Sequence, residues 1–152
     1  MRRSLVPVAV LIAAATACGS TPEPTASGEP SATPTAVRCD PEVPDVFSNW
    51  ELADEVEVPA QDRIGVRQTY VDDRRRNVTL MFGIRGETGE GLAPAGQRET
   101  ATGAVASLKG TDLAWALVWR EAGTCGDRTV LGAGFDQDGF EALMVEAGIL
   151  AE

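Results

Sequence analysis

The alternation of hydrophobic and polar residues predicts a β-hairpin in the middle of the chain. Apolar and polar positions alternate over residues 64–71 and again over 77–84, with a charged run, residues 72–76, between them. Two half-buried strands joined by a charged turn are typical of a hairpin. Because strand side chains alternate between the two faces, Val78, Leu80, Phe82 and Ile84 are expected to share one face.

Further strands are predicted on either side of this hairpin. Residues 111–121 are apolar on both faces, which favours a central strand, and residues 127–135 follow a Gly-Thr-Cys-Gly turn as its return strand. A weaker pattern over residues 103–108 adds another strand. Residues 43–58 are ambiguous, since their apolar positions fit a short helix or turn that leads to a strand at 55–58.

The end of the chain has the pattern of a helix. Asp138 and Glu141 have the spacing of a capping box, in which an aspartate caps the helix and a glutamate reaches back. The same stretch resembles a calcium loop, but its glycine stands at position four instead of six, and helix capping explains it without an ion. One apolar stripe follows at helical intervals: Phe140, Leu143, Met144, Ala147 and Leu150. The predicted fold class is α+β, an antiparallel β-sheet with a C-terminal helix packed on one face.

Residues 1–17 have the features of a signal peptide. Arg2 and Arg3 precede an apolar core, residues 5–17, that ends in small residues. The core is too short to cross roughly 30 Å of hydrocarbon comfortably, which favours a transient signal. The arginine pair leaves general and twin-arginine export both open.

The signal ends directly at a cysteine. The stretch Ala15-Thr-Ala-Cys18 resembles the bacterial lipobox at its last three positions, and Ala15 stands where the lipobox usually has leucine. The resemblance implies cleavage before Cys18 and fatty acylation, such as by palmitate, which anchors the protein to the extracytoplasmic face of the cell membrane. Cleavage after Ala17 that leaves Cys18 unmodified is the alternative.

A stalk and one globular domain are expected beyond the signal. Residues 18–38 are rich in proline, threonine and serine and lack aromatic residues, so they are predicted to be a disordered tether. Residues 39–152 have the size and apolar content of a single domain.

The cysteine count predicts one disulfide. If Cys18 is acylated, Cys39 and Cys125 remain, the even number expected of an exported domain. We expect them to form a disulfide, because such bonds persist outside the cytoplasm. Two reduced, buried cysteines are the alternative, and a metal pair is disfavoured because no histidine completes a site.

Charge and composition exclude several classes of function. Removal of residues 1–17 takes two of the 13 basic residues, so the mature chain has a net charge of 11 − 23 = −12. Such a chain repels nucleic acid, and the absence of histidine excludes serine–histidine and cysteine–histidine catalysis. We therefore expect no enzyme, no cofactor and no metal site. One lysine against twelve arginines indicates a GC-rich genome, such as that of an actinobacterium.

Two features are candidates for binding. Residues 86–102 are predicted to be a long Gly- and Glu-rich loop in which Glu87, Glu90 and Glu99 meet a basic partner, and a mobile insertion is the alternative. Trp115 and Trp119 share one face of the central strand and are candidates for stacking a sugar ring, although core positions are the simpler interpretation.

The order of elements over residues 60–150 resembles small sheet-and-helix modules on extracytoplasmic proteins of Gram-positive bacteria, some of them related to stress or sporulation. That resemblance implies no catalytic residues. The sequence therefore predicts a membrane-anchored lipoprotein whose domain is a non-catalytic protein-interaction module. A small-ligand or glycan-binding envelope protein is the alternative, a small hydrolase is a third possibility, and the oligomeric state is left open.

Overall fold

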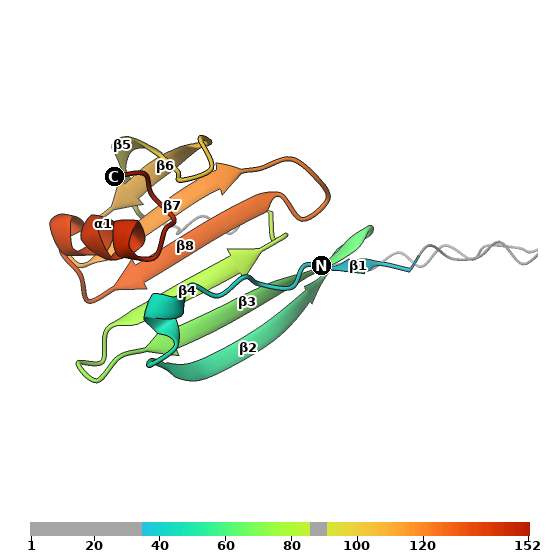
Figure 1. The fold of residues 1–152 in the computed structure, drawn as a ribbon, viewed down its shortest axis with the longest axis horizontal. Helices are drawn as coiled ribbons and strands as arrows, with labels where there is room; N and C mark the ends of the chain where they lie inside the picture. Colours follow the sequence, from blue (N-terminus) through green and yellow to red (C-terminus); the bar gives the residue numbers. More distant parts are fainter. Residues whose placement is uncertain (1–34, 86–90) are drawn as a thin grey trace, which may run out of the picture. The chain divides into compact units, whose positions relative to one another are not determined.

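The computed structural model describes residues 35–85 and 91–152, which belong to one compact unit (Figure 1). Within these ranges the elements are β1 (Val37–Arg38), η1 (Asp45–Phe47), β2 (Glu51–Pro59), β3 (Arg63–Val71), β4 (Asn77–Phe82), β5 (Ala93–Glu99), β6 (Val105–Gly110), β7 (Ala114–Arg120), β8 (Asp127–Ala133) and α1 (Gln137–Glu146). The predicted α+β class is confirmed. No helix in the described ranges is long and apolar enough to cross a membrane.

The strands form one sheet in the order β1-β3-β4-β8-β7-β6-β5, and β2 also pairs with β3. Neighbouring strands are antiparallel, except that β1 runs parallel to β3. The predicted hairpin is confirmed as β3 and β4, and the predicted central strand is β7, which lies between β6 and β8. The pairing of β4 with β8 joins the first half of the domain to the second.

The core lies on one face of this sheet. Phe47, at the end of η1, and Phe140 and Met144 of α1 are almost completely buried in one cluster with strand residues such as Leu80 and Leu117. Figure 1 shows α1 lying across β7 and β8 and η1 lying across β3 and β4. Each large apolar side chain that is fully buried contributes about 1.5–3 kcal/mol, so these two elements hold the layers together.

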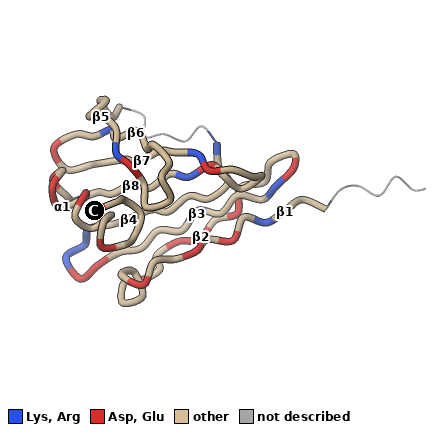
Figure 2. Tube along the Cα trace, turned by 45° about the horizontal axis from the view of Figure 1, so that its top comes forward, with Lys and Arg blue, Asp and Glu red and all other residues tan. Residues whose placement is uncertain are grey.

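Residues 43–58, whose sequence pattern was ambiguous, form both a short helix and a strand. A short 3-10 helix is followed by β2, which is nine residues long and starts well before residue 55. β2 lies beside β3, and its side chains are mostly exposed; four of its nine residues are acidic, and Figure 2 shows them as red segments along the strand. Val37 and Arg38, which the sequence assigned to the stalk, pair with β3 and so belong to the sheet.

The prediction of a loop over all of residues 86–102 is wrong for its second half. Residues 93–99 form β5, an edge strand paired with β6. The strand contains Pro94 and has a bulge between Pro94 and Gly96, where the backbone φ of Gly96 is 118°. Proline is tolerated on an edge strand because it does not have to donate a hydrogen bond there.

The capping of α1 also differs from the prediction. Asp136, not Asp138, is the N-cap, and its carboxylate accepts a hydrogen bond from the Gly139 amide at 2.9 Å. Glu141 accepts two hydrogen bonds from Arg98 of β5, at 2.6 and 2.7 Å, instead of reaching back to the cap. The apolar stripe itself is confirmed: Phe140, Met144 and Leu150 are buried, and Leu143 and Ala147 are partly buried.

Candidate functional site

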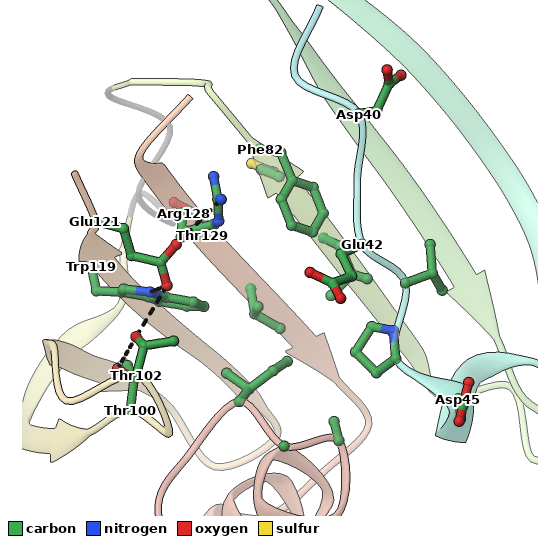
Figure 3. A pocket seen from close by; sticks show the side chains of 18 residues that line it. Asp40, Glu42, Asp45, Phe82, Thr100, Thr102, Trp119, Glu121, Arg128 and Thr129 are labelled. Carbon is green, nitrogen blue, oxygen red and sulfur yellow. Dashed lines mark hydrogen bonds and ion pairs between the residues drawn. The ribbon is translucent and has the colours of Figure 1, made fainter. Parts of the chain in front are cut away.

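A groove of about 540 Å³ opens on the covered face of the sheet (Figure 3). It lies between residues 40–45, which lead into the start of η1, and residues 147–149, which follow α1. Its floor includes Phe82 of β4, Arg128 of β8 and Trp119 of β7. The volume is within the range of small-ligand sites in proteins.

The wall formed by residues 40–45 is fixed at both of its ends. Cys39 forms the predicted disulfide with Cys125, with a Cα–Cα distance of 5.4 Å, and its amide donates to the Ile64 carbonyl at 2.8 Å. At the other end, the Phe47 ring stacks on the Tyr70 ring at 5.8 Å. Gly83 is required beside the disulfide, because its φ is 67° and a Cβ there would lie 2.4 Å from the Cys39 sulfur.

The opposite wall is held by backbone hydrogen bonds. Gly148 has a φ of 67°, a left-handed conformation that favours glycine just after a helix. The chain then runs beside the end of β5, where Ala101 donates to the Ile149 carbonyl and Ala151 donates to the Glu99 carbonyl, each at 3.0 Å. This pairing fixes the C-terminal segment against the sheet without a longer helix.

Glu121 is the centre of the polar contacts in the groove. Its Oε1 accepts hydrogen bonds from Trp119 Nε1 and from Thr102 Oγ1, both at 3.2 Å. The Thr102 hydroxyl also lies 3.0 Å from the hydroxyl of Thr100, which is buried. These contacts fix the Trp119 ring, which is half-buried at the edge of the groove.

Arg128 completes this arrangement. Its Nη2 lies 3.3 Å from Glu121 Oε2, and its Nη1 donates to the Cys125 carbonyl. The guanidinium carbon is 5.1 Å from the centroid of the Phe82 ring, which is within cation–π range. The groove therefore combines two aromatic rings with hydroxyl, carboxylate and guanidinium groups, and Figure 3 shows these side chains facing a common space.

The structure separates the two tryptophans that the sequence grouped together. Trp115 belongs to the core: it is 8% exposed, and its indole donates to the Phe135 carbonyl at 3.1 Å. Trp119 lines the groove instead. Of the predicted partner-binding acids, Glu99 is exposed at the end of β5, whereas Glu87 and Glu90 lie outside the described residues.

Several groove residues were missed by sequence reasoning, namely Glu42, Phe82, Thr100, Thr102, Glu121 and Arg128. The strand pattern contains a signal for two of them, Glu121 and Arg128. Trp119 and Glu121 are two residues apart, and the return strand places Arg128 directly opposite Trp119. The predicted Cys39–Cys125 disulfide also indicates that residues 40–45 lie near Glu121 and Arg128, whereas the sequence gives no signal that Thr100 and Thr102 lie there.

No protein-family model, curated protein or solved structure matches this chain. In the described ranges, histidine, cysteine and acidic side chains form no group of three or more that could hold a metal ion. The interpretation of the groove therefore rests on its geometry.

Proposed function

We propose that this protein is an exported, lipid-anchored binding protein whose groove takes a small ligand with a flat apolar face and a hydroxyl-rich edge. A sugar ring of a cell-envelope glycan has these properties. The observation that carries the proposal is the placement of Trp119, which is half-buried, fixed by its hydrogen bond to Glu121 and open to the groove.

The residues around Trp119 match the two sides of a sugar ring. Tryptophan offers a broad apolar surface on which the axial C–H face of a sugar can stack. Thr102, Glu121 and Arg128 beside it supply donors and acceptors for ring hydroxyls. Leu80 and Val130 add apolar side chains to the floor of the groove.

Anchoring is the second part of the proposal. Cys18 carries the lipid, and the residues that follow it tether the domain to the extracytoplasmic face of the membrane. The signal-like residues 1–17 and the lipobox-like stretch support this, although they lie outside the described residues. The Cys39–Cys125 disulfide adds support, because it uses the two remaining cysteines and is the kind of bond that persists outside the cytoplasm.

The anchor is tested by intact-mass analysis of the protein extracted from membranes with detergent. We expect a mature chain that begins at Cys18 with the added mass of a diacylglyceryl group. A freely soluble product that begins at Cys18 without added mass contradicts the anchor.

The groove is tested by calorimetry of the mature protein with a panel of envelope glycans. Trp119→Leu is expected to weaken the binding of any ligand by about 10-fold, equal to about 1.4 kcal/mol, because the stacking surface is lost. Trp119→Phe retains a flat ring and is expected to bind with intermediate affinity. Val105→Ala, an exposed residue of β6 outside the groove, serves as the control. Equal affinities for the Trp119→Leu variant and the unsubstituted protein contradict the proposal.

The protein-interaction module predicted from the sequence is the second candidate. It is favoured by β5, an edge strand that pairs with β6 on one side and whose outer edge meets the C-terminal segment only at Glu99 among the described residues, because an exposed strand edge can take up an extended peptide. Pro94 and the adjacent bulge shorten the available edge, however. Cross-linking from membranes, with Gln97→Pro as the variant that blocks the edge, tests this candidate.

A further inference from the structure

The side chains that line the groove have a negative net charge. Four carboxylates line it, from Asp40, Glu42, Asp45 and Glu121, and Arg128 is the one basic side chain among the described lining residues. Their formal charge is therefore 1 − 4 = −3. A concave site with one sign of charge attracts the opposite charge and repels its own.

The single cation is already paired. Arg128 contacts the Glu121 carboxylate, the Cys125 carbonyl and the Phe82 ring at the same time. An anionic ligand would therefore have to displace Glu121 before it could use this charge.

The carboxylates of the opposite wall have fewer ion pairs with the rest of the described residues. Asp40 pairs with Arg38, but Glu42 and Asp45 form no ion pair with any described residue. Figure 3 shows the Glu42 carboxylate extending from residues 40–45 into the space that Glu121 and Trp119 border from the other side. The Glu42 carboxylate therefore lies across the groove from the Trp119 ring and Glu121, a combination of negative charge and aromatic surface that suits an ammonium group.

We propose that the ligand of this groove carries a protonated amine, which lies between Glu42 and Glu121 and against the Trp119 ring. This inference rests on the proposed sugar-binding function and names the charge class of its ligand: a glycan unit with a free amine, not an acetylated or an acidic one. Glu42 is then the residue that sets specificity, whereas Trp119 supplies stacking that any sugar can use.

Three oligosaccharides of matched size test the charge class. The trimers of glucosamine, of N-acetylglucosamine and of galacturonic acid offer cationic, neutral and anionic rings. Calorimetry of the mature protein is done at about pH 6, where amines are protonated and exposed carboxylates are ionised. We expect the glucosamine trimer to bind at least ~10-fold more tightly than the acetylated trimer, the galacturonic trimer to bind most weakly, and the difference to shrink as salt rises from about 50 to about 500 mM.

Glu42→Gln assigns the preference to one side chain. Because Glu42 is exposed, this variant is expected to fold as the unsubstituted protein does. It should weaken the glucosamine trimer by about 5-fold and leave the acetylated trimer unchanged, since a single charge–charge contact near the surface is lost. Glu51→Gln removes an exposed carboxylate of β2 that does not line the groove, and it should change neither affinity.

The outcomes separate this inference from the proposed function. Equal affinities for the cationic and neutral trimers, tighter binding of the galacturonic trimer, or an equal loss for both trimers in Glu42→Gln would overturn the inference and leave a sugar-binding groove in place. Absence of measurable binding for all three trimers would overturn the proposed function, and this inference with it.

Discussion

Cys39 and Cys125 form a disulfide that joins the two segments flanking the groove. Cys39 directly precedes the wall of residues 40–45, and Cys125 lies in the turn between Glu121 and Arg128. The bond therefore fixes how far the acidic wall stands from the polar contacts around Trp119. It acts on the shape of the groove as well as on the stability of the domain.

Loss of this disulfide is predicted to lower both stability and ligand affinity. The double variant Cys39→Ser, Cys125→Ser should reduce the free energy of unfolding by about 2–5 kcal/mol. The bond links two residues that are 86 positions apart in the sequence, and so it restricts the conformations of the unfolded chain. Chemical denaturation measures the change, and reduction of the unsubstituted protein should reproduce it. An unchanged denaturation midpoint in both experiments would show that the bond does not constrain the domain.

The Arg98–Glu141 pair is predicted to make stability depend on pH. The hydrogen bonds from Arg98 lower the pKa of the Glu141 carboxyl, with a smaller contribution from Gln137, and they outweigh the opposing effect of burial. Because the pKa is lower in the folded than in the unfolded state, the stabilisation is present above the unfolded value, about 4.3, and is lost as the pH falls through the folded value.

The measurement compares Glu141→Gln with the unsubstituted protein from about pH 6 to about pH 3. The difference in unfolding free energy should be largest at pH 6 and shrink towards the acid end. Glu146→Gln, on the exposed side of α1 and without an ion pair in the described structure, is the matched control variant. A pH-independent difference for Glu141→Gln would show that this pair does not contribute to acid sensitivity.

Gly110 is predicted to be intolerant of a side chain because Trp115 covers it. A Cβ at Gly110 would lie 2.1–2.5 Å from three ring carbons of Trp115, which is itself held in the core. Gly110→Ala should therefore destabilise the domain by about 1–3 kcal/mol, as overpacking of a core does. Ser107→Ala, at an exposed position of the same strand, is the control in thermal unfolding, and equal melting temperatures for the two variants would contradict this packing.

The sequence predicted the strands whose side chains alternate between core and solvent. β3 and β4 were found in this way, since Val78 and Leu80 face the core while Thr79 between them does not. β2 and β5 lie at or near the edges of the sheet, and backbone pairing and polar side-chain contacts, such as that of Arg98 with Glu141, hold them instead of buried side chains. The sequence therefore predicted only residues 55–58 of β2 and no part of β5. The helix cap was placed two residues too late, because Asp136 and Asp138 are both suitable capping residues and only the backbone conformation distinguishes them.

The groove was harder to predict than the fold. Its two walls come from residues 40–45 and 147–149, at opposite ends of the domain, and only the sheet order brings them together. Trp115 and Trp119 are equivalent in the strand pattern. They differ because the core formed with Phe135 and Phe140 extends over Trp115, while Trp119 borders the opening between η1 and the end of α1.

The most direct test of the ligand-binding groove uses the three tryptophans of the chain as reporters in one NMR spectrum. Titration of the mature protein with the glucosamine trimer should shift the indole N–H signal of Trp119 and leave those of Trp115, which is bound to the Phe135 carbonyl, and of Trp50, which lies outside the groove, in place. A trimer that binds by calorimetry without moving the Trp119 signal, or that moves the Trp115 signal instead, would contradict the assignment of this groove as the binding site.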